Sequence, residues 1–302
     1  MKKVGIVVLH YKGKNLTDQC FKFLNEINIK NYQIIKILVD NCSPEPVDYL
    51  RKKFKDLKII KNSQNLGFAE GNNVGIRYAL KNGADYILIL NNDTTVDKNF
   101  LIYLIKQSDL INKSGIFGPK IYFAPCYEYH KNRYKKEERG KVFWYAGGLI
   151  DWKNIYCSHR GVDEVDRGQY DKVEETDFVS GCAMLVKREV FEKVGLFDPR
   201  YFLYLEDVDF CVRAKKAGFK IIYVPQAKVW HYNAGSSEVG GSLHDYFITR
   251  NRMLFGIKYA SLRTKIALIK ESFKIFLKGR KWQKIAIRDF YFQKFGKGSW
   301  ID

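Results

Sequence analysis

Three short groups of polar residues have the composition of a catalytic site. Residues 91–93 (Asn-Asn-Asp) directly follow an apolar run, and residues 206–209 (Glu-Asp-Val-Asp) follow an aromatic stretch. A third group, residues 229–231 (Val-Trp-His), ends a short apolar stretch with a histidine. Carboxylates beside apolar residues, if buried, are paired, bind a cation, or have a raised pKa that suits proton transfer. Two separate carboxylate groups therefore suit a metal–diphosphate site with a distinct base.

Hard oxygen ligands with a single imidazole favour Mg²⁺ or Mn²⁺ over zinc, which prefers more histidine or cysteine. Plainer interpretations stand beside this one. A lone histidine at a strand end, such as His231, is more often a hydrogen-bonded surface residue. Asp209 is better explained as a carboxylate in the first turn of a helix than as a catalytic group. Asp40, Asn65 and Asp93 are residue types that commonly cap helix N-termini.

Four short apolar runs alternate with helical stretches in the first ninety residues. Each run suits a strand buried on both faces, and the stretches between them have apolar residues at helical spacing, least clearly between the second and third runs. This alternation predicts a parallel sheet with right-handed crossovers, a Rossmann-like α/β half-domain. The expected strands are 4–9, 34–39, 57–60 and 86–90, and the expected helical faces are 16–27 and 76–80, the latter after a glycine-containing turn at 66–71.

The ends of these strands are polar, and ligands of such sheets bind beyond the carboxyl ends of the strands. No Gly-x-Gly-x-x-Gly follows the first strand, and no Walker-type Gly-Lys-Ser/Thr occurs. A dinucleotide oxidoreductase or a P-loop enzyme would need such a loop to hold phosphate. We therefore expect any bound phosphate to be held through a metal ion.

The remainder of the chain has a less regular pattern between residues 100 and 178. Beyond it, residues 178–186 predict a turn into a strand, and residues 188–194 predict a short helix closed by Gly195. Residues 221–224 predict a further strand that stops at Pro225.

Taken together, six segments in order resemble family 2 glycosyltransferases with the GT-A fold, and within that family the bacterial rhamnosyltransferase-like branch. The resemblance implies an α/β protein with a Rossmann-like, mostly parallel central sheet flanked by helices and a helical C-terminal extension. The implied GT-A domain is 1–250, with a nucleotide-sugar half (1–99) and an acceptor and catalytic half (100–250), and the extension is 251–302. The segments are 4–11, 39–43, 65–75, 90–94, 180–184 and 195–209.

The resemblance also implies roles for individual residues. Asp207 matches the catalytic base, and Asp93 and His231 match positions that hold the metal. Asn91 replaces the first aspartate of the family's Asp-x-Asp motif, which lowers the negative charge of the site. Asp40 matches the contact to the nucleotide base. The full donor-binding set is His10, Tyr11, Asp40, Asn65, Gly67, Asn73, Asn91, Asn92 and Arg250, and the acceptor-binding set is Gly181 and Glu206.

The implied reaction is an inverting, metal-dependent transfer of a sugar, rhamnose or another 6-deoxyhexose, from a nucleotide-diphosphate donor. The acceptor is a saccharide, free or lipid-linked, in the synthesis of cell-surface polysaccharide. One alternative is a UDP-hexose-dependent transferase of the same fold. An alternative of another class is a basic nucleic-acid-binding protein, but no such motif occurs and acidic clusters repel a phosphate backbone.

The chain has 302 residues, of which 46% are hydrophobic, and a formal net charge of +19. This composition excludes a disordered chain, and the length suits one or two domains. The charge predicts an anionic partner: nucleic acid, a phosphorylated ligand or an acidic membrane. Residues 250–302 contain 14 Lys and Arg against 3 Asp and Glu. More than half of the excess charge therefore lies in the C-terminal segment.

A basic amphipathic helix is expected in this segment. Its pattern fits two arrangements equally well: the apolar stripe packs on the catalytic domain, or it lies on an anionic bilayer. The second arrangement suits a lipid-linked acceptor and a peripheral position on the inner face of the cell membrane. The apolar stripe is Ile266, Ile269, Phe273, Phe276 and Leu277, and the basic stripe is Lys270, Lys274 and Lys278.

Three further patterns predict a cytoplasmic protein. Six scattered cysteines indicate reduced thiols rather than a disulfide framework. The apolar run after Met1 is too short for a signal-peptide core. No apolar stretch approaches the roughly 18 residues that a membrane span requires.

Overall fold

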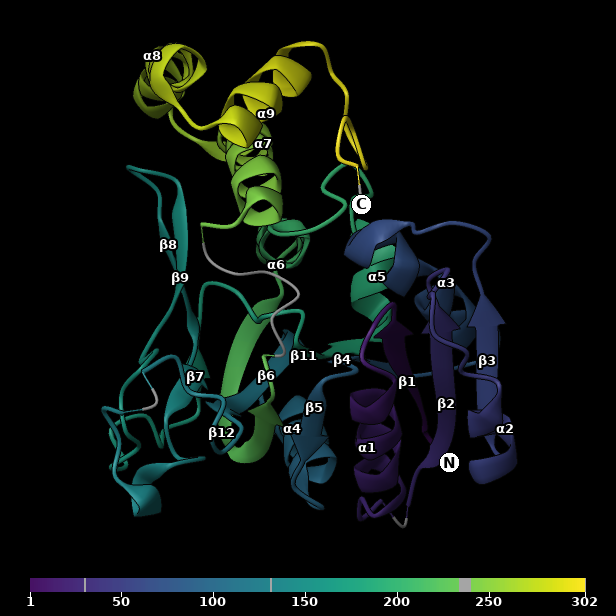
Figure 1. Ribbon diagram of the computed structural model, residues 1–302. Coiled ribbons are helices and arrows are strands. Elements are labelled where there is room, and N and C mark those ends of the chain that lie inside the picture. The colour runs from purple at the N-terminus through teal and green to yellow at the C-terminus, as the bar shows by residue number, and fades with distance from the viewer. Residues whose placement is uncertain (30, 131, 234–239, 302) are drawn as a thin grey trace.

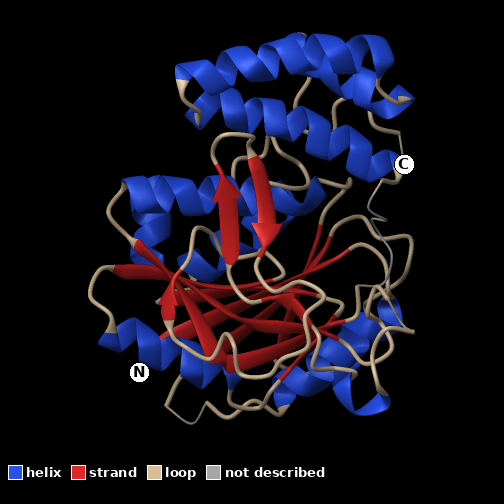
Figure 2. Cartoon of the chain, turned by 90° about the vertical axis from the view of Figure 1, so that its left-hand side faces the viewer, coloured by secondary structure: helices blue, strands red, loops and turns tan. Residues whose placement is uncertain are grey.

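A ten-stranded sheet forms the centre of the computed structural model, which describes residues 1–29, 31–130, 132–233 and 240–301. Helices pack on both faces of the sheet, and three C-terminal helices are stacked above it (Figures 1 and 2). The strands of the sheet are β1 (Lys3–His10), β2 (Gln33–Asp40), β3 (Leu57–Lys61), β4 (Tyr86–Asn91), β5 (Thr94–Val96), β6 (Ser114–Phe123), β7 (Phe143–Tyr145), β10 (Glu174–Glu175), β11 (Ala183–Lys187) and β12 (Lys220–His231); β8 (Gly148–Asp151) and β9 (Tyr156–His159) form a separate hairpin.

The four strands predicted in the first ninety residues are confirmed. They pair in parallel in the order β4-β1-β2-β3. Val4, Ile6, Val7 and Val8 of β1 are fully buried, as expected for a parallel strand covered on both faces. The α/β class and the mostly parallel sheet are therefore confirmed, although β11 runs antiparallel between β4 and β6.

The helices of the first half are present, and the weakest predicted link, between β2 and β3, holds only the five-residue helix α2. The stretch expected as a turn at 66–71 belongs mostly to α3, which begins at Gly67. Glycine serves close packing there, because a Cβ on Gly75 would lie 2.4 Å from Val7 Cγ1. The helices are α1 (Lys14–Asn25), α2 (Tyr49–Lys53), α3 (Gly67–Lys81), α4 (Phe100–Leu110), α5 (Arg188–Val194), α6 (Glu206–Lys216), α7 (Ser242–Tyr259), α8 (Leu262–Lys278), α9 (Lys281–Tyr291) and the short 3₁₀ turn η1 (Lys136–Glu138).

Two strands of the second half differ from the sequence prediction. All ten residues of β6 are buried, yet glycine, proline and lysine interrupt its apolar run and it falls in the region expected to be irregular. β12 continues through Pro225 to His231, so the predicted stop after 221–224 is wrong. The register of β12 against β6 shifts between Val224 and Lys228, and this shift accommodates the proline. The predicted helix 188–194 and its closing glycine are confirmed.

The C-terminal helices form a layer of their own. The expected boundary between residues 250 and 251 falls inside α7, which continues to Tyr259. α8 is the expected amphipathic helix, and its apolar stripe is largely exposed: Phe273 is 60% and Leu277 71% exposed, although the Phe273 ring lies 6.3 Å from the ring of Tyr291 on α9. Figure 1 shows α8 at the outer surface of this layer, and the segment after α9 returning toward the loop between α5 and α6. Asp302, the last residue of the predicted extension, lies outside the described residues.

Candidate active site

The carboxyl ends of β1, β2 and β4 meet at one edge of the sheet. The register pairs His10 with Asp40 and Leu9 with Asn91. Asp40 is largely buried, and its Oδ1 accepts a hydrogen bond from Ser43 N at 2.8 Å. Ligands of open parallel sheets bind beyond this edge, so the fold brings together these strand-end residues predicted to bind a donor.

His10 is fully buried, and both nitrogens of its ring lie next to hydroxyl groups. Nδ1 lies 2.8 Å from Thr17 Oγ1, and Nε2 lies 3.0 Å from Ser43 Oγ. Burial lowers the pKa of His10, and the Asp40 carboxylate only partly opposes this. The ring is therefore held in place at this strand end, and Tyr11 beside it is half-buried; the predicted contact of both residues with the donor stays a prediction.

Asn41 organises the turn between β3 and α3, a role that the sequence prediction missed. Its Nδ2 donates to Asn65 Oδ1 at 2.9 Å and to Gly67 O at 3.1 Å. Its Oδ1 accepts from Leu66 N and from Asn62 Nδ2, each at 3.0 Å. Asn65 Oδ1 also accepts from Gly67 N at 2.9 Å. The N-cap position of α3 is Leu66, which has no side-chain cap bond, so Asn65 is not the N-cap residue; its side chain instead closes the turn just before the helix.

Asn92 and Asn73 have structural bonds where donor contacts were predicted. Asn92 Nδ2 donates to Lys12 O and to Thr17 Oγ1, both at 2.8 Å, which ties the end of β4 to the start of α1. Asn73 Nδ2 donates to Phe197 O at 2.9 Å, and its Oδ1 accepts from Phe197 N at 3.1 Å. Because Asn73 is 1% exposed, it joins α3 to the turn after α5 and does not face a ligand.

Asp93 and His231 form a polar pair at the end of β12. His231 Nε2 lies 3.2 Å from Asp93 Oδ1, and the pairing of Thr94 with His231 fixes the two strands. His231 Nδ1 is buried and has no hydrogen-bond partner among the described residues. Asn91, two residues before Asp93, is half-buried. Its backbone N donates to Cys182 O at 2.8 Å.

This pair fits a divalent cation that completes its shell elsewhere. Within the described ranges, no group of three or more His, Cys, Asp or Glu residues is placed to hold a metal ion without other ligands. Mg²⁺ and related hard cations commonly use one or two protein ligands together with substrate phosphate oxygens and water. The Asp93 carboxylate and a buried imidazole with one unpartnered nitrogen suit that arrangement.

Glu206 and Asp207 begin α6; Glu206 is buried, whereas Asp207 is half-buried. Asp207 Oδ2 accepts from Gly181 N and its Oδ1 accepts from Val208 N, both at 2.8 Å. Burial raises the pKa of Asp207, and the two backbone bonds oppose the rise. Burial and then the charge of Asp207 raise the pKa of Glu206 well above its ordinary range. Since backbone N–H groups favour the ionised form of Asp207, the pair keeps its charge on Asp207 and its proton on Glu206.

Asp209, on the same helix, is a structural residue. It is fully buried and accepts hydrogen bonds from Arg213 Nε at 2.8 Å and from Lys258 Nζ at 2.7 Å. The hydroxyls of Tyr201 and Tyr259 donate to the same carboxylate. The preference for a non-catalytic role is thus supported, although the reason is a buried ion-pair network that joins α6 to α7.

A strained loop leads into α6. Phe202, Tyr204 and Leu205 have φ angles of 63°, 70° and 69°, a region that costs an L-residue roughly 1–2 kcal/mol. Phe202 O accepts from Phe68 N at 2.6 Å. Gly67 lies against the same residue, because a Cβ there would be 2.5 Å from the Phe202 ring. Gly67 thus holds α3 against this loop, a packing role that the predicted donor contact did not include.

Arg250 holds the other side of this loop and does not reach a diphosphate as predicted. It is fully buried. Nη2 donates to Arg200 O at 3.2 Å and to Tyr201 O at 3.0 Å, and Nη1 donates to Gly296 O at 2.7 Å. Nε donates to Asn251 Oδ1 at 3.1 Å. All three nitrogens are therefore engaged in bonds within the protein.

The start of β11 connects the two carboxylate groups of the site. Gly181 donates to Asp207, and the next residue, Cys182, accepts from the backbone of Asn91. Burial raises the pKa of the Cys182 thiol, and the charges of Asp93 and Asp207 raise it further.

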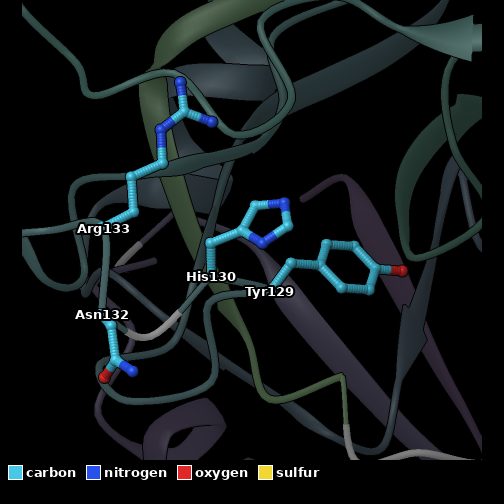
Figure 3. A pocket seen from close by; sticks show the side chains of 4 residues that line it. All are labelled: Tyr129, His130, Asn132 and Arg133. Atoms are coloured by element: carbon cyan, nitrogen blue, oxygen red, sulfur yellow. The ribbon is translucent and has the colours of Figure 1, made fainter.

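An open pocket of about 710 Å³ borders this region (Figure 3). It is lined by Tyr129, His130, Asn132 and Arg133. The ring of Tyr129 packs edge-on against Phe123 at 5.3 Å, and Phe123 pairs with His231 in the sheet. The pocket contains none of the predicted site residues.

The sequence matches the family model described as "Glycosyltransferase like family 2" over residues 4–256. It is similar to an N-acetylglucosaminyl-diphospho-decaprenol L-rhamnosyltransferase of Mycobacterium tuberculosis, with 25% identity over 230 residues and 72% of each chain covered. It is also 27% identical over 214 residues to the dTDP-rhamnosyl transferase RfbF of Shigella flexneri, covering 68% of this chain and 65% of that protein. The rhamnosyltransferase WbbL of Escherichia coli is 25% identical over 225 residues, covering 71% and 79%.

Solved structures support the fold. GalNAc-T7 with UDP, GalNAc and Mn²⁺ superposes with a TM-score of 0.62 at 15% identity, covering 84% of this chain and about half, 51%, of that one. TarS of S. aureus in complex with UDP-GlcNAc superposes with a TM-score of 0.58 at 14% identity, covering 96% and 79%. These likenesses establish a GT-A-like architecture, as predicted.

Proposed function

Because the family model matches most of the chain, the protein belongs to glycosyltransferase family 2, and we propose that it transfers a sugar with inversion from a nucleotide-diphosphate donor to a saccharide acceptor. The observation that supports this proposal is the presence of two separate acidic functions near the start of β11. One is the Asp93–His231 pair, and the other is the half-buried carboxylate of Asp207, whose pKa is raised by its surroundings. An inverting transfer needs a stabiliser of the leaving diphosphate and a distinct base.

Asp207 is the proposed base. The two backbone bonds from Gly181 and Val208 fix the plane of its carboxylate. The acceptor hydroxyl gives its proton to Asp207 as its oxygen attacks the anomeric carbon from the face opposite the nucleotide. Glu206, which keeps its proton, is buried beside Asp207, and its Oε2 has no hydrogen-bond partner in the described protein; a hydrogen bond from Glu206 to the acceptor is part of the proposal.

Asp93 and His231 would hold Mg²⁺ or Mn²⁺. The bound cation supplies Lewis-acid stabilisation of the charge that develops on the departing diphosphate. Asn91 adds no negative charge beside Asp93, so the diphosphate itself must contribute much of the cation's binding energy. Asp40, at the end of β2, accepts hydrogen bonds from the nucleotide base, and Tyr11 lines the same pocket.

L-Rhamnose or another 6-deoxyhexose, carried by dTDP, is the proposed donor sugar. The similarity to three curated rhamnosyltransferases supports it, and one of these is described as a dTDP-rhamnosyl transferase. A lipid-linked saccharide is the proposed acceptor, because the name of the mycobacterial relative describes a diphospho-decaprenol substrate. The proposed role is therefore in cell-surface polysaccharide synthesis.

A lipid-linked acceptor requires access to a membrane, and the proposed contact is the exposed face of α8. None of the described helices is long and apolar enough to cross a bilayer. The face combines exposed apolar side chains with lysines, as expected for a helix lying in the plane of an anionic lipid surface. Its exposed apolar residues are Leu262, Ile266, Ile269, Phe273, Phe276 and Leu277. The proposed location is thus the cytoplasmic face of the cell membrane.

A thermal-shift panel tests the donor class. The wild-type protein is heated with dTDP, UDP or GDP, with and without Mn²⁺, because a ligand that binds only the folded state raises Tm. We expect a Mn²⁺-dependent rise that is largest for dTDP and that Asp93→Asn removes. A rise with UDP alone would favour a UDP-hexose donor. If no nucleotide raised Tm and the protein bound single-stranded DNA or RNA in a salt-sensitive way, the proposed enzymatic function would be contradicted.

A further inference from the structure

We propose that Arg250 and Asn251 of α7 are positioning residues for Asp207, acting through the loop of residues 200–205. This inference rests on the proposed base role of Asp207. It assigns Arg250 a place in the reaction different from the diphosphate contact that the sequence suggested. Arg250 and Asn251 do not bond the Asp207 carboxylate. Their bonds go to the backbone that leads into α6.

Asn251 is the centre of this arrangement. Its Nδ2 donates to the backbone oxygens of Tyr201, Leu203 and Tyr204 at 2.8, 2.7 and 2.9 Å. Its Oδ1 accepts from Nε and Nη2 of Arg250, each at 3.1 Å. The Arg250 guanidinium thus orients the Asn251 amide, and this one buried amide donates to three backbone carbonyls of the same loop.

The loop needs such a clamp because its backbone is strained. Left-handed φ angles at Phe202, Tyr204 and Leu205 are adopted by bulky L-residues only when the surroundings impose them. Leu205 immediately precedes α6, whose second residue is Asp207. A shift of the loop therefore moves the carboxylate relative to Gly181. Misplacement of a reacting group by about 1 Å can lower a rate on the order of 100-fold.

The clamp also connects the active site to the C-terminal helical layer. The ring of Phe247 on α7 stacks on Phe202 at 5.1 Å with an interplanar angle of 12°. Gly296, after α9, donates its N–H to Arg200 O at 2.9 Å and accepts from Arg250. α7 and the returning C-terminal segment thus both contact the loop.

Asn251→Asp tests the proposal, because it keeps the size of the side chain and removes the donating amide. Arg252→Lys is the matched control, since Arg252 bonds Glu271 and Asn154 O and not the loop. The readout is nucleoside-diphosphate release with the donor that the wild type uses, as kcat and KM across pH, beside deuterium uptake of the peptide that contains 200–205. We expect kcat to fall about 10- to 100-fold with KM for the donor unchanged, the acidic limb of the pH profile to shift, and the loop to exchange faster.

Arg250→Lys is the second variant if Asn251→Asp fails to fold, and it should give a smaller change in the same direction. A folded variant with wild-type kcat, pH profile and deuterium uptake would overturn the clamp. An equal fall in kcat for Arg252→Lys would overturn it as well, because the effect would then belong to α7 as a whole. A wild-type protein that neither binds nor consumes any nucleotide sugar contradicts the proposed function instead.

Discussion

The two sides of the site are built in different ways. On the donor side, side chains at the ends of β1 and β2 are held by partners in the same Rossmann-like half, such as Thr17 and Ser43 around His10, although Asp93, just after β4, pairs with His231 of the second half. On the acceptor side, Asp207 depends on a strained loop that α7 and the C-terminal segment hold. These partners are distant in the sequence: Asn251 lies 47 residues after Tyr204, and Arg250 lies 49 residues after Tyr201.

This difference separates binding from catalysis. The donor side is a sheet edge that needs little beyond correct strand pairing, so changes elsewhere should leave nucleotide binding intact. The acceptor side transmits disturbances in the C-terminal layer to the base. A change confined to one side should therefore affect that side and spare the other, unless it acts where the two sides meet.

Asp207→Asn should have the largest effect and should act on the acceptor side alone. Without a carboxylate to take the proton, transfer should fall by about 10²–10⁴-fold, the usual contribution of a general base. The Mn²⁺-dependent rise in Tm with nucleotide should remain, because Asp93 and His231 are unchanged. Glu189→Gln, an exposed carboxylate on α5, is the control. Transfer at the wild-type rate in Asp207→Asn would show that another group is the base.

Gly67→Ala should act where the two sides meet, at the contact of α3 with the strained loop. A Cβ there would lie 2.5 Å from Phe202, and the φ of +75° is unfavourable for alanine. We expect the free energy of unfolding to fall by about 2–4 kcal/mol in urea titration. Gly218→Ala is the control, because Gly218, just after α6, has a φ of +93° with nothing within 4 Å of an added Cβ. Equal losses in both variants would mean that only the backbone angle matters.

The donor side was largely predictable from the sequence because its signals are local. Apolar runs gave the strands, and polar residues directly after them gave the edge that holds Asp40, Asn91 and Asp93. The roles of Asn41 and Asn73 were not predictable in the same way. Whether a buried amide faces a ligand or a distant backbone depends on which segments the fold places opposite it, as with Asn73 and Phe197.

For the acceptor side, the sequence predicts which residue types form the site but not how the fold positions them. The Glu206-Asp207 pair stands out as acidic residues after aromatic ones, but nothing local indicates that Arg250 would turn toward Tyr201 rather than toward a ligand. β6 was missed because polar and glycine positions interrupt a strand that long-range pairing nonetheless buries. Pro225 predicts the end of a strand, but a register shift in the pairing of β12 with β6 accommodates it. β6 lies about a hundred residues earlier, so no local signal reveals this shift.

Phe273→Ser together with Phe276→Ser should weaken membrane contact while leaving both sides of the site intact. These side chains are 60% and 50% exposed on α8, and burying a whole phenylalanine contributes about 1.5–3 kcal/mol. We expect at least a tenfold lower partition onto liposomes containing anionic lipid, with nucleotide binding unchanged. Leu110→Ser is the control, since Leu110 is 75% exposed at the end of α4. Wild-type partition in the double variant, or equal binding to neutral and anionic liposomes, contradicts the proposed surface.

Glu206→Gln should give the smallest effect, a gain in stability that appears only at neutral pH. Burial and the charge of Asp207 raise the pKa of Glu206, so the folded state holds this proton more tightly than the unfolded state, whose glutamate has a pKa of about 4.3. The stability that the proton provides is fully present below that pH and is lost as pH rises toward the raised folded pKa. Glutamine has no proton to lose, so the variant should unfold at a higher urea concentration than the wild type at pH 7.5 and at nearly the same concentration at pH 4. A pH-independent difference would mean that Glu206 is ionised at no cost, and that the acceptor side does not keep one proton on its carboxylate pair.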